Sequence, residues 1–326
     1  MTDSSPRKIA LIIGITGQDG TFCKELLLSK GYEVVGTTRS IKDAYIKIPS
    51  LQSDVVKLAE WDLLNYEKIR LIIDKFSPSE IYNFAGMTYG GARLFDDPIL
   101  MSEINGLAIV RILEAIKEVN PRIKFSQASS SEMFGRKKDL IVNEDSPLDA
   151  ASPYAAAKIF AHSMIAIYRN NFDIHACSAI LFNHESSLRS RDFVSRKITS
   201  TVAQIKMGLQ DELLLGNIEA SRDWLYAGDS VKAMWMMLNA DKACDFVVSS
   251  GLSHSLKHFC DIAFNYVGLN YRDYVKTSAD LYRKNDDVVI VGDNSRLIGI
   301  GWRPSLNFKE MVEMMVESDL LKLKHK

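Results

Sequence analysis

Short apolar runs alternate with segments of helical periodicity through the first half of the chain. The apolar runs have the length of buried strands, and in the segments between them hydrophobic residues recur three and four positions apart. The predicted strands are residues 9–14, 32–38, 55–61, 80–86, 123–129 and 175–182, and the predicted helices are residues 19–30, 65–76, 98–119 and 153–171. Strands joined by helices in this order form βαβ units. The pattern therefore predicts an α/β fold with a Rossmann-type doubly wound parallel sheet, covered by helices on both faces.

The periodicity loosens in the second half of the chain. Residues 183–193 have the composition of a loop, residues 194–208 predict a helix, and only short elements follow. No Gly/Ser linker separates the halves, so we expect residues 1–183 to form mainly the Rossmann domain. Residues 184–326 are then expected to form a smaller α/β C-terminal lobe that binds substrate and is interwoven with the first domain. Ligands of such sheets bind beyond the carboxyl ends of the strands.

Composition narrows the classes of protein that fit this pattern. The 326 residues are 47% hydrophobic and 25% charged, with a net charge of −1, which is typical of a globular protein. A nucleic-acid partner is not expected, because the chain has no basic excess, and no apolar run reaches the ~18 residues of a membrane span. The four cysteines are far apart in the sequence, which predicts reduced thiols and a cytoplasmic location.

A glycine-rich turn follows the first predicted strand. The sequence GITGQDG places glycines at Gly14, Gly17 and Gly20, directly before a predicted helix. Glycines there permit tight backbone angles and close approach to a pyrophosphate, and the helix N-terminus stabilises the anion. The turn therefore predicts a dinucleotide site, with a simple tight turn as the alternative.

The end of the second predicted strand bears on the choice of dinucleotide. An acidic residue there usually binds the free ribose of NAD, but the sequence TTRS offers Arg39 instead. An arginine pairs with the 2′-phosphate of NADP, so NADP is favoured over NAD. The alternative is an ordinary surface arginine.

A tyrosine and a lysine lie four residues apart on a predicted helix. Tyr154 and Lys158 share one face of that helix, and a nearby ammonium would lower the pKa of the tyrosine and suit it as a general base. Ser130 follows the strand before this helix. The order of glycine turn, serine and YxxxK resembles the extended short-chain dehydrogenase/reductase superfamily. The resemblance implies that Ser130 donates to the substrate oxygen and that Lys158 also holds the nicotinamide ribose.

Glu132, in ASSSEMFG, adds a carboxylate that simple redox chemistry does not need. Removal of hydride from C4 of a sugar leaves a ketone and acidifies the hydrogen at C5. A carboxylate over C5 could remove that proton and then, as an acid, protonate the departing C6 hydroxyl. Glu132 therefore indicates a redox-neutral 4,6-dehydration. The alternative is a helix-start glutamate that serves as a cap or a solvated charge.

Longer motifs resemble one family closely. GITGQDG, NGLAIVRILEAI, ASSSEMFG, SPYAAAK, LFNHES, VSRKIT, KMGLQDELLLGN and RDWLYAGD are similar to GDP-mannose 4,6-dehydratases over roughly residues 8–318. The family implies tightly bound NADP, a GDP-sugar substrate and catalysis by Ser130, Glu132, Tyr154 and Lys158. The cofactor contacts that it implies are Gly14, Thr16, Gly17, Gln18, Asp19, Gly20, Arg39, Asp62, Leu63, Ala85, Tyr154, Lys158, His184 and Arg189. The substrate contacts that it implies are Thr88, Ser130, Glu132, Tyr154, Asn183, Val194, Lys197, Gly216, Asn217, Arg222, Arg283 and Asp286.

The chain departs from the family pattern around the sugar and the cofactor. The family's AAQSHV is AGMTYG here with Thr88 at the serine position, its tyrosine before NGL is Leu100, and Asp286 stands where glutamate is usual. These changes point to a GDP-sugar that is GDP-mannose or a related GDP-manno-heptose. Arg189 is single where the family has two adjacent arginines in a loop that reaches a neighbouring subunit. A homodimer is therefore expected, with a homotetramer as the alternative.

Two other functions fit parts of the sequence. The nearer alternative is an oxidoreductase, either a GDP-4-keto-sugar reductase or a GDP-sugar C4 dehydrogenase, which would not need Glu132. The other is a nucleotide-sensing protein without chemistry, which would not need the YxxxK pair. His254 and His258 lie four residues apart, but no third ligand is near them in the sequence, so a helix-start pair and no metal site are expected.

Overall fold

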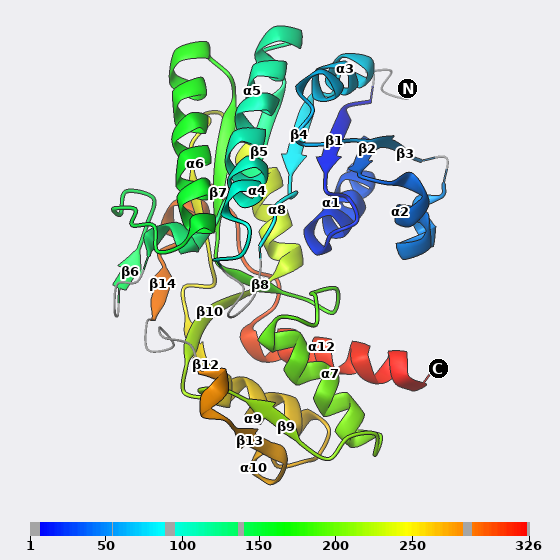
Figure 1. Ribbon diagram of the computed structural model, residues 1–326, viewed down its shortest axis with the longest axis vertical. Helices are drawn as coiled ribbons and strands as arrows, with labels where there is room; N and C mark the ends of the chain where they lie inside the picture. The colour runs from blue at the N-terminus through cyan, green and yellow to red at the C-terminus, as the bar shows by residue number, and fades with distance from the viewer. Residues whose placement is uncertain (1–6, 54, 89–94, 136–139, 283–288, 325–326) are drawn as a thin grey trace.

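The computed structural model describes residues 7–53, 55–88, 95–135, 140–282 and 289–324. Its main feature is a parallel sheet of seven strands in the order β11-β7-β5-β4-β1-β2-β3 (Figure 1). These strands are β1 (Ile9–Ile13), β2 (Glu33–Thr38), β3 (Val56–Glu60), β4 (Glu80–Asn83), β5 (Lys124–Ala128), β7 (Ala176–Leu181) and β11 (Phe246–Val248). The strand order reverses between β1 and β4, and such a switch point opens a crevice for ligands.

Helices cover both faces of this sheet. The helices before residue 183 are α1 (Gln18–Ser29), α2 (Ile41–Lys47), α3 (Tyr66–Phe76), α4 (Pro98–Ser102), the π-helical segment η3 (Glu103–Leu107), α5 (Ala108–Val119) and α6 (Pro153–Phe172), with short 3₁₀ turns η1 (Pro49–Leu51) and η4 (Ser131–Phe134). Helix α8 (Ala227–Leu238), from later in the chain, packs beside α1 on one face, and α3, α5 and α6 cover the other.

The alternation of side chains along β1 explains the two cores. Ala10 and Ile12 face the core shared with α1 and α8, whereas Leu11 and Ile13 face the core shared with α3, α5 and α6. All four side chains are almost fully buried. A strand that is apolar on both faces is what a doubly covered parallel sheet requires.

The second half of the chain contributes both to the sheet and to a separate lobe. Strand β11 joins the large sheet, α8 and α11 (Ser295–Gly299) pack on it, and most of the other elements form the lower part of the molecule around a core of their own (Figure 1). The lobe contains β8 (Asn183–Glu185), α7 (Val194–Lys206), β9 (Leu213–Leu215), β10 (Ser221–Tyr226), β12 (Ser253–Ser255), α9 (Leu256–Tyr266), α10 (Tyr271–Tyr274), β13 (Val275–Thr277), η5 (Ala279–Leu281) and α12 (Phe308–Lys324). Strand β6 (Leu140–Val142) pairs with β14 (Ile290–Gly292) at the side of the molecule.

The predicted strands and helices of the first half are confirmed to within a few residues. The helix expected over residues 98–119 is instead broken into α4, η3 and α5. The buried amide of Asn105 explains the break, because it donates to the Met101 carbonyl at 3.0 Å and also bonds to the backbone of Met87. The prediction of a loop over residues 183–193 was wrong at its start, where β8 pairs with β10.

Within the described residues, no helix has the length and apolar character that crossing a membrane requires.

Candidate active site

The glycine turn lies at the switch point of the sheet. Gly14 has φ +86°, and a Cβ there would lie 3.1 Å from the amide nitrogen of Ala85 at the end of β4. A Cβ on Gly20 would lie 2.3 Å from the Gly14 carbonyl oxygen, so the first turn of α1 packs against the turn only because Gly20 has no side chain. The predicted turn therefore has the required geometry.

The start of α1 fits the diphosphate of a dinucleotide. Gly17 is the exposed N-cap residue, and it supplies no side-chain cap for the N–H groups of the first turn. Thr16 and Gln18 flank it. Free N–H groups and the helix dipole favour an anion at this place. The structure thus fits the dinucleotide that the sequence predicts.

An ion pair joins the first turn of α1 to β8. The Asp19 carboxylate lies 3.0 Å from Nε2 of His184, and Nδ1 of His184 donates to the Phe182 carbonyl at 2.8 Å. Burial opposes both charges, but their attraction prevails, so the pKa of His184 is raised and the pKa of Asp19 is lowered. Gln18 strengthens the connection, because it donates to the His184 carbonyl and accepts from the Ser186 hydroxyl.

Ser130 and Glu132 follow β5 at the carboxyl edge of the sheet. The Ser130 hydroxyl caps η4 by accepting the N–H of Glu132 at 3.2 Å. Ser130 is buried, whereas the Glu132 side chain is exposed. The short turn therefore holds Ser130 against the protein and leaves the carboxylate accessible to a ligand.

Tyr154 and Lys158 start α6, and Ser152 fixes where this helix begins. The Ser152 hydroxyl accepts the N–H of Ala155, which places Tyr154 in the first turn and Lys158 one turn later. Lys158 is only 4% exposed and donates to the Ala128 carbonyl at 2.8 Å. Burial lowers the pKa of Lys158 to about 8.

The expectation of a lowered tyrosine pKa was wrong. Burial raises the pKa of Tyr154 to about 12, and the negative charge of Glu132 raises it further, while a hydrogen bond with Ser130 and the charge of Arg189 lower it. The Lys158 ammonium lies 5.7 Å from the centre of the tyrosine ring and is directed to the Ala128 carbonyl. Desolvation therefore outweighs the stabilisation of phenolate that the YxxxK spacing predicts. Ser130, Glu132, Tyr154 and Lys158 nevertheless converge on one place.

The other predicted cofactor residues lie along the same edge of the sheet. Arg39 is exposed directly after β2, and Asp62 follows β3, where its carboxylate accepts the N–H of Leu64 at 2.9 Å. The carbonyl of Leu63 accepts from Arg111 at 3.4 Å. The ends of β1, β2, β3 and β4 thus present these residues in the order expected along an extended dinucleotide.

The predicted substrate residues come from the lobe. Asn183 on β8 lies opposite Trp224 on the neighbouring strand β10. Arg222 lies on the same strand β10, and its guanidinium donates to the Ser221 carbonyl at 2.7 Å. Val194 and Lys197 lie in the first turns of α7, and Gly216 and Asn217 follow β9. A Cβ on Gly216 would lie 2.5 Å from the Leu281 carbonyl oxygen. Thr88 is exposed after β4, while Arg283 and Asp286 lie outside the described residues.

One residue that organises the site, Asn105, was missed by sequence reasoning. Asn105 holds the segment after β4, because its side chain bonds to both the N–H and the carbonyl of Met87. Arg189, which the resemblance implies as a cofactor contact, lies 3.5 Å from the Glu185 carboxylate and 3.6 Å from the ring centre of Phe193. Asn105 lies in the π-helical segment η3, which is often a mark of a functional site. Hydrophobic periodicity does not reveal so short an interruption, so no signal in the sequence pointed to Asn105.

The two neighbouring histidines pack against Phe308. Nδ1 of His254 lies 3.3 Å from Nδ1 of His258, and the His254 ring stacks on Phe308 at 3.9 Å. In the described parts of the chain, no group of three or more His, Cys, Asp or Glu side chains is arranged to hold a metal ion.

Comparison with known proteins places the chain in a family. A family model described as GDP-mannose 4,6 dehydratase matches residues 11–315. GDP-mannose 4,6 dehydratase 1 of Arabidopsis thaliana is 41% identical over 328 residues, which cover 97% of this chain and 90% of that protein.

Solved structures support the fold. RMD from Pseudomonas aeruginosa complexed with NADPH matches with a TM-score of 0.81 at 20% identity, over 97% of this chain and 98% of that one. dTDP-glucose 4,6-dehydratase from Bacillus anthracis in complex with NAD matches with a TM-score of 0.82 at 18% identity, over 95% and 96% of the two chains. The resemblance drawn from the sequence is confirmed, and the chain belongs to the GDP-mannose 4,6-dehydratase family.

Proposed function

We propose that the protein catalyses the 4,6-dehydration of a GDP-sugar with a nicotinamide cofactor that is regenerated in each turnover. The observation that carries this proposal is the exposed Glu132 carboxylate beside the Ser130, Tyr154 and Lys158 side chains, in a member of this family. A reductase or a C4 dehydrogenase uses the last three residues but has no use for the first.

Tyr154 and Ser130 act at the C4 hydroxyl. A bound oxidised nicotinamide supplies reversible hydride transfer, from C4 and back to C6, and a positive charge. Tyr154 takes the proton of the C4 hydroxyl, and Ser130 donates a hydrogen bond to the same oxygen as it becomes a carbonyl. The proton on Tyr154 in the ligand-free protein, where its pKa is about 12, must leave before this step. Lys158 holds the cofactor ribose and provides the nearest buried cation.

Glu132 acts at C5 and C6. The C4 carbonyl acidifies the hydrogen at C5, which the Glu132 carboxylate removes. The carboxylic acid then gives this proton to the C6 hydroxyl, which leaves as water. Tyr154 then releases to solvent the proton that it took from the C4 hydroxyl, and solvent supplies the proton that is added at C5. The product is therefore the 4-keto-6-deoxy sugar, formed with loss of one water and with no net oxidation or reduction.

A Glu132→Gln variant tests the proposal. We expect the variant to keep cofactor binding and to lose formation of the 4-keto-6-deoxy product by a factor of roughly 10² to 10⁴. Mass spectrometry of the reaction in heavy water measures this, because dehydration removes one water and places solvent deuterium at C5. Near-parental product formation by the variant, or accumulation of reduced cofactor by the parent enzyme, would reject the assignment.

We assign NADP as the cofactor. Arg39 supports this choice, because it lies exposed at the end of β2, where an acid would favour NAD. The matched solved structures hold either NADPH or NAD, so the residue at this place carries the argument. Replacing Arg39 by alanine is expected to weaken NADP binding about tenfold or more while leaving NAD binding unchanged, as titration of both cofactors would measure.

The sugar of the substrate has two candidates. Lys197 and Arg222 supply cations for the diphosphate of a GDP-sugar, and they lie on α7 and β10 of the lobe. GDP-mannose is the first candidate because the relatives are named for it. GDP-manno-heptose is the second, because Gly86 and Thr88 lie in a segment beside Lys158 where the chain departs from the family. A Cβ on Gly86 would lie 3.8 Å from the lysine nitrogen. The relative rates of water loss from the two sugars decide between them.

The enzyme is proposed to be a homodimer built on η3, α5 and α6. Leu107, Phe160 and Ile167 are 42%, 42% and 45% exposed, and Phe160 and Ile167 lie two turns apart on α6. A Cβ on Gly106 would lie 3.3 Å from the Phe160 ring, so the exposed groups on η3 and α6 form one surface. A second copy that presents the same helices would bury these side chains, and a tetramer is the other outcome that a mass measurement can give.

A further inference from the structure

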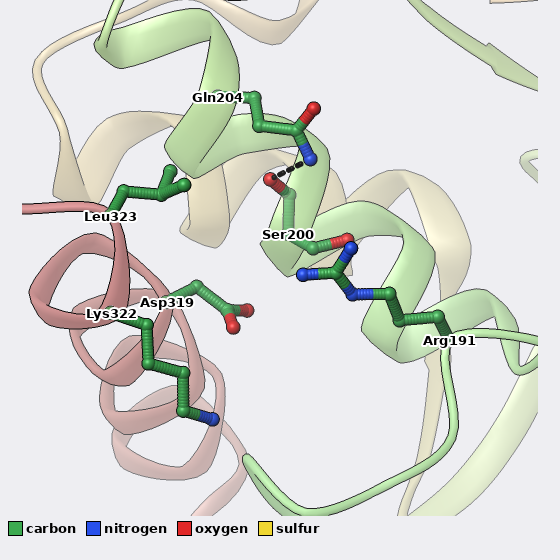
Figure 2. A pocket seen from close by; sticks show the side chains of 6 residues that line it. All are labelled: Arg191, Ser200, Gln204, Asp319, Lys322 and Leu323. Atoms are coloured by element: carbon green, nitrogen blue, oxygen red, sulfur yellow. Dashed lines mark hydrogen bonds between the residues drawn. The ribbon is translucent and has the colours of Figure 1, made fainter. Parts of the chain in front are cut away.

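A pocket with several charged and polar side chains in its lining lies outside the site described above, between α7, α12 and the loop that joins β8 to α7. Its volume is about 210 Å³. Figure 2 shows the side chains that line it, which are Arg191, Ser200, Gln204, Asp319, Lys322 and Leu323. Arg191 comes from the loop, the next two residues from α7 and the last three from α12.

Two of the positive charges around the pocket are not neutralised. Asp319 is buried, and its carboxylate accepts hydrogen bonds from the buried Arg196 and from Thr199, so the charges of Asp319 and Arg196 balance. Arg191 makes no hydrogen bond or ion pair with any residue that the structure describes. The ammonium of Lys322 makes one hydrogen bond, to the Ser187 carbonyl at 3.1 Å. Burial lowers the pKa of Lys322, and the positive charges of Arg196 and Arg191 lower it further, against the opposing effect of the negative charge of Asp319.

The loop beside the pocket also touches the active site. On the pocket side, Lys322 donates a hydrogen bond to the Ser187 carbonyl, and Arg196 donates one to the Arg189 carbonyl at 3.3 Å. On the other side, the Ser186 hydroxyl donates to Gln18 in the first turn of α1 at 2.7 Å. The charge of Arg189 also lowers the pKa of Tyr154 and of Asp19. Residues 186–193 therefore connect the pocket with the first turn of α1.

We propose that this pocket binds a phosphate group, as inorganic phosphate or as a small phosphorylated metabolite, and that the bound group strengthens cofactor binding through the loop of residues 186–193. A phosphate between Arg191 and Lys322 joins the loop to α12. The guanidinium offers a planar pair of donors, and the ammonium has two N–H donors beyond the one that it uses. When the phosphate has already ordered the loop, the loop has less conformational entropy to lose on cofactor binding, so the cofactor binds more tightly.

Calorimetric titration with inorganic phosphate tests the site. The enzyme is first saturated with NADP and GDP, which occupy the dinucleotide and diphosphate sites, and sodium chloride holds the ionic strength constant. We expect saturable binding, and a loss of affinity of about tenfold for each of Arg191→Ala and Lys322→Ala, since each removes a charged hydrogen bond. Lys324→Ala removes an exposed charge from the same helix and is expected to change the affinity less than twofold. No binding, or equal binding by all three variants, overturns the proposal.

The coupling has its own measurement. The dissociation constant of NADP is expected to fall several-fold in saturating phosphate for the parent and for Lys324→Ala, and to stay unchanged for the Arg191→Ala/Lys322→Ala double variant. Phosphate must in turn bind more tightly to the cofactor-loaded enzyme by the same factor. Binding without this reciprocal change overturns the regulatory half of the proposal.

The source of the phosphate group is decided by competition. A hexose phosphate that displaces inorganic phosphate at a tenfold lower concentration identifies a metabolite site, and equal or weaker displacement identifies a site for the inorganic ion. These measurements follow binding alone, so they do not depend on whether Glu132 has the role proposed above.

Discussion

At the scale of single residues, burial raises the pKa of Tyr154 and lowers the pKa of Lys158. Both groups lose charge when they are removed from water, so the tyrosine becomes a weaker acid and the lysine a stronger one. At neutral pH the ligand-free site thus holds a protonated phenol next to an ammonium that deprotonates at about pH 8. The proposed chemistry at C4 therefore depends on ligands that stabilise the charged forms, which are the phenolate of Tyr154 and the ammonium of Lys158.

Replacing Lys158 by methionine is expected to stabilise the ligand-free protein. The folded-state pKa of about 8, against 10.5 for a free lysine, corresponds to a penalty of about 3 kcal/mol for burying the ammonium. This penalty is complete below about pH 8 and disappears as the pH rises to 10.5, because the amine is then neutral in both states. The variant should therefore unfold at higher urea concentration than the parent at pH 7, by an amount that shrinks toward pH 10.

Lys324→Met serves as the control for this experiment. Its side chain is exposed, so the substitution is expected to leave stability unchanged at either pH. A Lys158→Met protein no more stable than the parent at pH 7 would mean that neighbouring groups already compensate the buried charge.

The connection between α1 and β8 is the main feature at the element scale. Asp19 and His184 are separated by 165 residues in the sequence, and their ion pair fixes the first turn of α1 against the strand that begins the lobe. The dinucleotide turn and the substrate lobe are thus held together before any ligand binds. Disrupting the pair should reduce both stability and affinity for cofactor.

The contribution of this pair is expected to depend on pH. The pKa of His184 is raised, so its contribution is complete below about pH 6.5 and is lost as the pH rises through the folded-state value. The pKa of Asp19 is lowered, so its contribution is present above about pH 3.8 and is lost only at lower pH. His184→Gln should therefore destabilise the ligand-free protein by roughly 3 kcal/mol at pH 6 and by less at pH 9.

A double-mutant cycle isolates the pair. The Asp19→Asn/His184→Gln double variant should lose less stability at pH 6 than the two single variants together. Lys324→Gln replaces an exposed side chain, so it is the control and should leave stability unchanged at either pH. Strictly additive losses would show that the two side chains do not stabilise each other.

Local pattern was sufficient to predict most elements and the motif residues. The strands are apolar on both faces, and the glycine turn, Ser130 and YxxxK are short motifs whose geometry is set within a few residues. Helix α2 was missed, although Ser40 caps it in the usual way, because it is short and largely exposed. The pKa of Tyr154 and the partner of Asp19 depend on burial and on contacts distant in the sequence, which periodicity cannot predict.

The surface formed by Leu107, Phe160 and Ile167 matters at the scale of the whole molecule. Helices α5 and α6 lie side by side at the edge of the molecule away from α2 (Figure 1). This arrangement leaves the three apolar side chains exposed in one stripe, through which the proposed dimer would pair two copies as a four-helix bundle.

A charge in this stripe is expected to weaken the dimer. Phe160→Glu should shift the protein toward monomer, with a dissociation constant raised at least tenfold, because the carboxylate loses its water in the interface. Light scattering over a dilution series measures the change. Ile46→Glu places the same charge on an apolar residue that is 71% exposed on α2, and it should leave the mass unchanged. Equal behaviour of the two variants would locate the interface elsewhere.

Strand β11 lies far beyond its partner β7 in the sequence, and this affects how the chain folds during synthesis. Residues 176–181 of β7 are fully buried in the finished sheet, but their outer edge is covered only when Phe246–Val248 pairs with Ala179–Leu181. A ribosome has to add more than sixty further residues, Leu181 to Phe246, before that edge is protected. In the interval the nascent chain exposes an unpaired apolar strand, which is an aggregation hazard that a chaperone would cover. A fragment ending at residue 183 is for this reason expected to precipitate and not to bind cofactor by itself.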